Sequence, residues 1–177
     1  QELHLYLGMF LAVTALVVFS IRPLYPTLGE TVRHAAFQVS SIMTTTGFST
    51  VDFNLWSSFA KGILLVLMVI GACAGSTGGG LKVSRIVILA KTSYHDMRKM
   101  LHPNAVTVVR LEGKPLQDKE IRSVHLFVVV YMIIFICSML LLSLEGFDLT
   151  TTFTALAACI NNIGPGLGEV GPMGNFS

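Results

Sequence analysis

Charged residues are scarce in this sequence. They make up 12% of its 177 residues, whereas a soluble domain carries about a quarter. Hydrophobic residues account for 53% of the chain, and the mean hydropathy is +0.70. The composition therefore argues against an ordinary water-soluble domain and predicts a membrane protein. The net charge of +2 carries little information by itself, and the distribution of charge along the chain carries more.

The sequence also lacks a cysteine framework and any grouping of catalytic residue types. Cys73, Cys137 and Cys159 lie singly in apolar segments, with no C-x-x-C spacing and no clustered histidines. This pattern favours small buried hydrophobic residues over disulfides or metal ligands. No nucleophile and base are grouped, so we expect neither an enzyme nor a bound organic cofactor. Without an initial methionine or a recognisable signal peptide, the chain is expected to be a fragment of a longer protein.

A nucleotide-binding loop is missing as well. Gly75 and Gly80 have the separation found in G-x-x-x-x-G-K-[ST], but Leu81 stands where the lysine belongs. Basic residues are scattered among apolar ones, so nucleic acid is not an expected partner. Nine of the twelve basic residues fall within residues 82–122. The positive-inside rule then predicts that this connection is cytoplasmic.

Two stretches are long and apolar enough to cross a membrane: residues 3–21 and 124–144. At a rise of about 1.5 Å per residue, each can cross a hydrocarbon core of about 30 Å. With the connection between them in the cytoplasm, the other side of the membrane carries acidic residues that would concentrate cations. These residues are Glu30, Asp52, Glu145, Asp148 and Glu169.

Each span is followed by a short apolar segment that ends in a polar glycine loop. A capping-box spacing at residues 27–30 predicts a helix of about 12 residues. Asp148 is a candidate N-cap for a second short helix at residues 149–160. Both helices are too short to cross a membrane, which favours re-entrant segments over amphipathic surface helices. A helix C-terminus that faces the membrane interior would favour a cation beside it.

The two glycine loops are candidate ion ligands. Residues 45–49, T-T-G-F-S, are a variation on the T-V-G-Y-G loop, whose backbone carbonyls replace the water shell of potassium. Glycine allows successive carbonyls to point at one axis. We expect a selectivity filter lined by aligned residues of the two loops, 117 positions apart: Thr45 with Asn162, Thr46 with Ile163, and Gly47 with Gly164. Potassium is expected at Thr45, Thr46, Asn162 and Ile163.

A glycine cluster interrupts the apolar sequence that follows the first loop. One continuous helix over residues 57–100 would be roughly 66 Å long, so the cluster is expected to break it at membrane depth. Non-helical backbone is tolerated there only against protein or beside a water-filled cavity. We expect an intramembrane gate below the filter; a plain kink for close helix packing is the alternative. The gate residues would be Gly75, Ser76, Thr77, Gly78, Gly79 and Gly80.

The order of span, short helix, glycine loop and span recurs along the chain. It predicts an all-α membrane protein built from span–pore helix–filter loop–span units, as in potassium channels. The expected parts are a first unit at residues 1–100 with a broken inner helix, a cytoplasmic connection at 101–120, and a second unit at 121–177 without its final inner helix. Because a potassium filter uses four loops, two of four units are present and the chain supplies half a pore.

Three motifs, in this order, resemble the Trk/Ktr/HKT superfamily of cation transporters. They are T-T-T-G-F-S at residues 44–49, A-G-S-T-G-G-G-L-K at 74–82 and N-N-I-G-P-G-L-G at 161–168. The resemblance covers essentially the whole chain, as the third and fourth repeats of a Trk-type potassium uptake subunit. It implies four repeats of one chain around one pore, a homodimer, and a multi-pass position in the bacterial inner membrane among lipid. It also implies a cytoplasmic, nucleotide-binding regulatory subunit.

The expected function is potassium uptake across the inner membrane. Gly47 and Gly164 favour potassium by family resemblance, while channel-like transport and symport with protons or sodium stay open. The alternatives are a sodium-permeable or mixed-cation transporter of the same superfamily, and a non-conducting scaffold that recruits a cytoplasmic partner through residues 82–122. A scaffold would lose nothing when Gly47 is changed.

Overall fold

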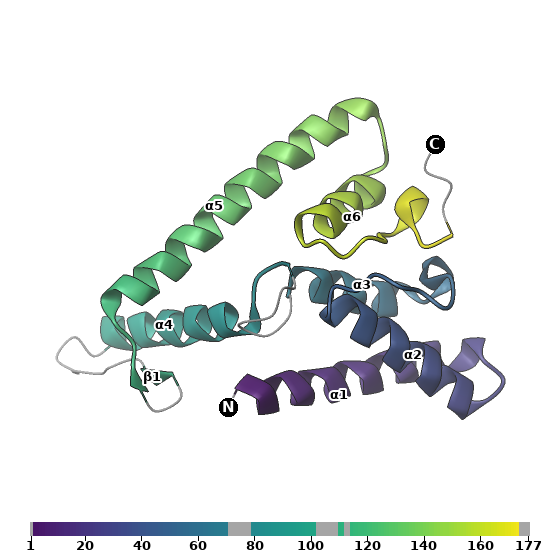
Figure 1. Ribbon diagram of the computed structural model, residues 1–177, viewed down its shortest axis with the longest axis horizontal. Helices are drawn as coiled ribbons and strands as arrows, with labels where there is room; N and C mark the ends of the chain where they lie inside the picture. Colours follow the sequence, from purple (N-terminus) through teal and green to yellow (C-terminus); the bar gives the residue numbers. More distant parts are fainter. Residues whose placement is uncertain (1, 71–78, 102–109, 112–113, 174–177) are drawn as a thin grey trace.

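The computed structural model describes residues 2–70, 79–101, 110–111 and 114–173. Helices dominate this part of the chain (Figure 1). The α-helices are α1 (Glu2–Ile21), α2 (Leu28–Met43), α3 (Ser58–Val69), α4 (Val83–Leu101), α5 (Asp118–Leu142) and α6 (Leu149–Ile160). Short 3-10 turns cover Arg22–Leu24, Phe53–Leu55, Ser143–Glu145 and Gly168–Val170. Two antiparallel two-residue strands, β1 (Arg110–Leu111) and β2 (Lys114–Pro115), lie in the connection before α5.

Two of these helices are long and apolar enough to span a membrane, as the sequence predicts. They cover His4–Leu24 and Asp118–Glu145, with their 3-10 ends included. Most of their side chains point outward, and Phe19 is 83% exposed. Helix α5 begins six residues before the expected span, because Gln117 and Glu120 form a capping box there. Exposed apolar side chains on a helix with internally satisfied backbone suit contact with lipid.

The short helices start at the predicted caps. The Thr27 hydroxyl accepts a hydrogen bond from the Glu30 amide at 3.3 Å, which starts α2. The Asp148 carboxylate accepts from the amides of Thr150 and Thr151 at 3.2 and 3.1 Å, which starts α6. Helix α6 has the expected 12 residues, but α2 has 16 rather than about 12. The extra turn lies at the start of the helix, because Thr27 caps it and helical structure begins directly at Leu28.

The core lies where α1, α2 and α3 pack together (Figure 1). Small residues such as Ala35 and Ala60 are fully buried in it, which allows the helices to approach closely. The hydroxyls of Ser20 and Ser57 meet between α1 and the start of α3. The larger buried side chains of this core are Val17, Ile21, Val39, Ile42, Met43, Phe53, Leu64, Leu67 and Met68.

The apolar run that begins with α3 is broken, as the sequence predicts, but the helix ends before the glycine cluster. Helix α3 ends at Val69, and α4 begins only at Val83. The two sides of the break touch: the Leu81 amide donates to the Val69 carbonyl at 3.2 Å, and Leu81 pairs with Ile70 in an isolated parallel bridge. Helix α4 then packs on α5, where the Arg85 guanidinium lies 3.8 Å from the centre of the Phe127 ring.

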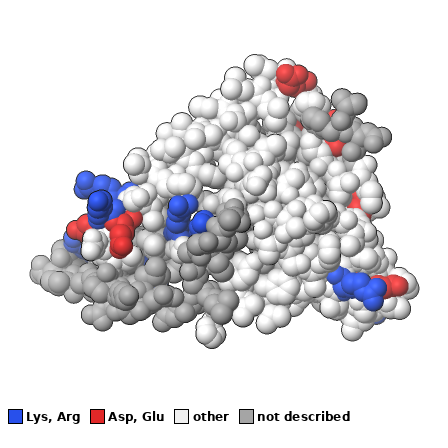
Figure 2. Space-filling model, in the orientation of Figure 1, with Lys and Arg blue, Asp and Glu red and all other residues white. Residues whose placement is uncertain are grey.

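Charged side chains gather at the two ends of α5. Figure 2 shows basic side chains with acidic ones among them where α4 and the start of α5 meet, and acidic side chains alone near the far end of α5. A smaller mixed group of charges lies over the corner between α1 and α2. The uncharged surface between these ends matches the apolar faces of the spanning helices.

Candidate functional site

Both short helices end in the same hydrogen-bonded turn, a Schellman motif. In this motif the second residue beyond the cap donates to the carbonyl five positions earlier, and the first donates to the carbonyl three positions earlier. The bonds are Thr46 to Ser41 (2.9 Å) and Thr45 to Ile42 (3.0 Å) after α2, and Ile163 to Ala158 (2.8 Å) and Asn162 to Cys159 (3.2 Å) after α6. The two loops therefore leave their helices in the same way, 117 residues apart.

The backbone angles of the two loops also correspond. Thr45 and Asn162 are left-handed, with φ of 55° and 54°, and Gly47 and Gly164 follow two positions later with φ of 80° and 108°. Glycine usually occupies the left-handed position that ends a helix, but here threonine and asparagine do. A left-handed β-branched residue such as Thr45 is a strained exception. The glycines were predictable from the sequence, whereas these two left-handed positions were missed. Threonine gives no signal of this conformation, and the tolerance of asparagine for it was not used.

The two loops meet at their glycines. A Cβ atom added to Gly47 would lie 1.9 Å from the carbonyl oxygen of Ile163 and 3.2 Å from the Pro165 ring. A Cβ added to Gly164 would lie 4.0 Å from the Gly47 Cα. The structure thus brings Gly47, Ile163 and Gly164 together. Within the described residues, Thr45 and Asn162 make no hydrogen bond to the opposite loop, and neither does Thr46.

Hydroxyl groups on α2 support the first loop from behind. The Ser41 hydroxyl donates to the Phe48 carbonyl at 2.6 Å, and the Ser49 hydroxyl donates to Gln38 Oε1 at 3.0 Å. Gln38 is fully buried. These contacts fix the path of the loop after Gly47. Side chains of α2, and not only the hydrogen-bonded turn at its end, therefore hold the backbone of the loop in place.

The second loop is supported in a different way. The Thr154 hydroxyl of α6 donates to the Leu167 carbonyl at 3.1 Å and accepts from the Leu167 amide at 3.0 Å. The Thr151 hydroxyl accepts from the Glu169 amide at 3.3 Å. Sequence reasoning did not assign these supports. Their signal was present, because a threonine-rich face in an otherwise apolar short helix needs hydrogen-bond partners.

Asn54 ties the segment after the first loop to the segment after the second. Its Oδ1 accepts from the Gly168 amide at 3.0 Å, and its Nδ2 donates to the Gly168 carbonyl at 3.2 Å. A Cβ at Gly171 would lie 1.9 Å from Asn54 Nδ2. This reciprocal pair joins residues 114 positions apart, so the sequence offered no local signal for it.

The described end of the predicted gate lies against the second loop. A Cβ at Gly79 would stand 2.1 Å from the carbonyl oxygen of Asn161, and one at Gly80 would stand 3.0 Å from Asn161 Oδ1. Gly80 is left-handed, with φ of 78°. The other predicted gate residues, Gly75, Ser76, Thr77 and Gly78, lie outside the described residues.

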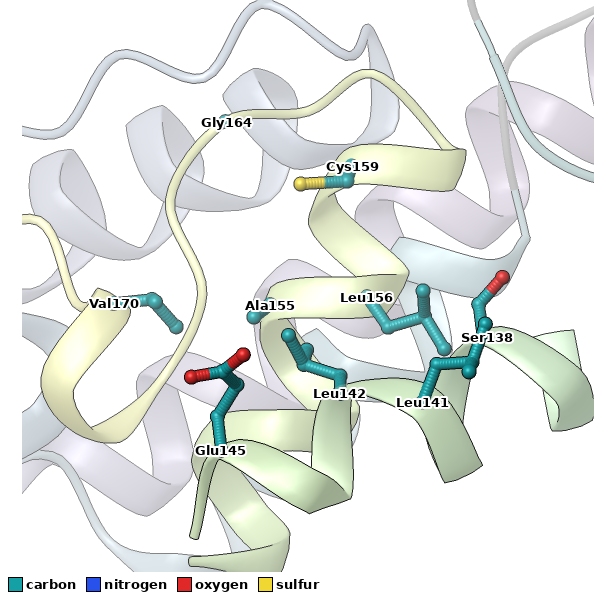
Figure 3. Close-up of a pocket in the computed structure, with 9 residues that line it drawn as sticks. All are labelled: Ser138, Leu141, Leu142, Glu145, Ala155, Leu156, Cys159, Gly164 and Val170. Atoms are coloured by element: carbon teal, nitrogen blue, oxygen red, sulfur yellow. The ribbon is translucent and has the colours of Figure 1, made fainter. Parts of the chain in front are cut away.

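An apolar groove of about 590 Å³ lies between the later part of α5 and α6 and reaches the second loop (Figure 3). Leucine side chains from both helices project into it, and the Glu145 carboxylate lies at one end, near Val170. Its lining offers no set of charged ligands. Nowhere in the described chain do three or more His, Cys, Asp or Glu side chains gather to hold a metal ion. Backbone carbonyls are therefore the candidate cation ligands.

Two spanning helices, a broken apolar helix and paired glycine loops define a helical integral membrane protein. The TrkH family profile, described as "Cation transport protein", matches residues 7–175. The chain therefore belongs to the TrkH family. Members of this family are ion transporters and not enzymes, and this chain is assigned to the bacterial inner membrane.

Individual relatives agree with this assignment. The chain is 38% identical over 171 residues to the Trk system potassium uptake protein TrkH of Salmonella typhimurium, covering 96% of this chain and 35% of the relative. It is 43% identical over 136 residues to that of Vibrio parahaemolyticus, covering 77% and 28%. The crystal structure of the potassium transporter TrkH from Vibrio parahaemolyticus superposes with a TM-score of 0.88 at 34% identity, covering 98% of this chain and 38% of that one. The chain spans about a third of the length of these relatives.

Proposed function

We propose that this chain forms half of a potassium uptake pathway. In this proposal, potassium is the cargo and passes the backbone carbonyls of the two loops. The observation that carries it is the meeting of two loops with the same Schellman geometry at Gly47 and Ile163. The names of the relatives, Trk system potassium uptake proteins, support potassium as the ion. The proposed ligands are Thr45, Thr46, Gly47, Asn162, Ile163 and Gly164.

Carbonyl ligands suit potassium because they replace its hydration shell without adding net charge. The left-handed residues turn each chain away from its helix axis, and the supports behind the loops hold the carbonyls that follow. The two loops differ in side chains and in supports. We therefore expect fewer well-formed ion positions than in a fourfold symmetric channel, with the best one near Gly47 and Gly164.

Below this filter, residues 75–80 are the proposed gate. The described part of that segment, Gly79 and Gly80, lies against Asn161, the residue before the second loop. A segment in this position can obstruct the ion path directly below the filter. The proposed assembly completes the pore with two further repeats of the same protein. It also includes a homodimer, surrounding lipid and a cytoplasmic nucleotide-binding subunit at the basic end of α4 and α5, with residues 101–120 as the connection between units.

Rubidium uptake by liposomes that contain the full-length parent tests the function. Uptake that resists excess external sodium is the expected result. Strong competition by sodium would replace the proposal with a mixed-cation pathway. Absence of uptake, with the cytoplasmic subunit and its nucleotide supplied, would favour the alternative of a non-conducting scaffold.

The gate assignment needs a matched pair of alanine variants. Gly79→Ala should change the rubidium flux at least severalfold, because the added Cβ would displace the backbone next to Asn161. Gly62→Ala on α3 is the control, since its Cβ would meet no described atom within 4 Å. Equal flux in the two variants would contradict a gate at this segment, and an altered ion preference in Gly79→Ala would assign it to the filter instead.

A further inference from the structure

Asn161 lies where three parts of the molecule meet. It caps the C-terminus of α6, directly before the second loop, and its side chain is fully buried. The Tyr131 hydroxyl, from the middle of α5, donates a hydrogen bond to Asn161 Oδ1 at 3.0 Å. Tyr131 itself is 9% exposed. A spanning helix thus reaches the base of the second loop through one buried polar contact.

The third part is the segment that returns to α4 after the helix break, residues 79–81, here called the return segment. Its two glycines leave no room for a side chain beside Asn161: the added Cβ atoms would lie 2.1 and 3.0 Å from Asn161 oxygens. The Leu81 amide, at the end of the segment, is bonded to the carbonyl of Val69. The return segment is therefore seated between the end of α3 and the Asn161 amide group.

Stability alone does not explain an asparagine at position 161. Its Nδ2 is buried and finds no hydrogen-bond acceptor among the residues that the structure describes, and an unsatisfied buried donor is destabilising. The backbone of the second loop does not need this side chain, because the amides of Asn162 and Ile163 bond to carbonyls of α6. What the side chain does contact is Tyr131 and the return segment.

We propose that Tyr131 and Asn161 are positioning residues that hold the return segment against the base of the second loop. The tyrosine hydroxyl orients the Asn161 amide, and the amide forms the seat of Gly80. Loss of the hydroxyl loosens the return segment and leaves the loop carbonyls in place. The consequence for transport rests on the proposed function: flux changes while ion preference is retained.

The first test measures position without transport. Hydrogen–deuterium exchange of the full-length parent follows the peptide that contains Leu81, whose amide is bonded across the helix break. Tyr131→Phe removes only the hydroxyl and should speed exchange about fivefold, the factor that corresponds to about 1 kcal/mol for one hydrogen bond. Tyr94→Phe, at a 64% exposed position on α4, is the control. Equal exchange in the two variants would overturn the proposal.

The second test measures rubidium flux and sodium competition in the same variants. Tyr131→Phe should raise flux about fivefold over Tyr94→Phe, with unchanged ion preference. Asn161→Leu should act in the same direction, and the double variant should add little, because both changes remove one contact. Additive effects, or a changed ion preference, would overturn the proposal. If Asn161→Leu does not assemble, the comparison of Tyr131→Phe with Tyr94→Phe decides the test. Absence of flux in the parent would contradict the proposed function, whereas the exchange result would still decide the positioning role.

Discussion

Gly47 and Gly164 occupy matching places in the two loops but meet different surroundings. Both have a positive φ, which disfavours any side chain. At Gly47 an added Cβ would also collide with the Ile163 carbonyl, whereas at Gly164 the nearest described atom is 4.0 Å away. Position 47 therefore requires glycine because of both its backbone conformation and its contact with Ile163. Position 164 requires glycine because of its backbone conformation alone.

This difference predicts a graded effect on selectivity in the full-length parent. Gly47→Ala should abolish discrimination between rubidium and sodium, because the Ile163 carbonyl must move. Gly164→Ser should weaken discrimination and leave assembly intact, with backbone strain of about 1–3 kcal/mol. Sodium competition of rubidium uptake measures both, and size-exclusion chromatography checks assembly. Gly8→Ala, whose Cβ would meet no described atom within 4 Å, is the control; selectivity like that of the control in both loop variants would remove the loops from the filter.

Residue types predicted the loop glycines but not the rest of the site. Glycine signals a positive φ directly, so Gly47 and Gly164 could be assigned from the sequence. Asn161 could not, because its role depends on Tyr131, 30 residues earlier on another helix, and on the return segment. Asn54 depends on a partner 114 residues away. One sequence carries no information on such pairings.

At the scale of elements, the N-cap of α6 makes the stability of this helix sensitive to pH. Hydrogen bonds from Thr151, first from its side chain and then from its backbone, lower the pKa of the Asp148 carboxyl below its ordinary value of 3.8. A carboxyl with a lowered pKa stabilises the folded state fully above its ordinary value. That contribution is lost as the pH falls through the lower pKa of the folded state.

Replacement of this carboxylate should therefore matter at neutral pH and not in acid. Asp148→Asn keeps an oxygen that can cap the helix but does not titrate. The melting temperature of the variant should lie below that of the parent at about pH 7, and the two should converge once the pH has fallen below the lowered pKa of Asp148. Thermal unfolding in detergent at several pH values measures this. A difference that persists unchanged into acid would mean that the carboxylate charge does not act at this cap.

Element boundaries were predictable where a local signal sets them. Thr27 and Asp148 start α2 and α6 as their side chains predicted. The early start of α5 at Asp118 was missed because its first turns are polar and the span was predicted from apolar residues only. Its capping box can nevertheless be read from the sequence. The common end of α2 and α6 was missed because Thr45 and Asn162 hold a conformation typical of glycine.

At the scale of the whole molecule, the fold turns its apolar side chains outward. Ile133 is 56% exposed in the middle of α5, and Leu144 is 82% exposed at its end. In water these faces would aggregate; in a bilayer they meet a solvent of their own polarity. Membrane class, helical fold and family were all predictable from the sequence, because hydropathy and three ordered motifs extend over the full chain.

The depth of a charge along α5 should decide whether it is tolerated. Ile133→Lys places a charge near the helix centre, at a cost of about 2.5–3.5 kcal/mol. Leu144→Lys places the same charge near the helix end, where it can reach the interface. Membrane insertion of the full-length parent, assayed by alkali extraction, should fall for the first variant and not for the second. Equal insertion of both would mean that this face of α5 does not contact lipid.

The contact between Leu81 and Val69 has a consequence for how the two sides of the helix break are coupled. Because the Leu81 amide is bonded to the Val69 carbonyl and Leu81 pairs with Ile70, the chain that enters α4 is fastened to the end of α3. A displacement of the end of α3 is therefore passed directly to the start of α4.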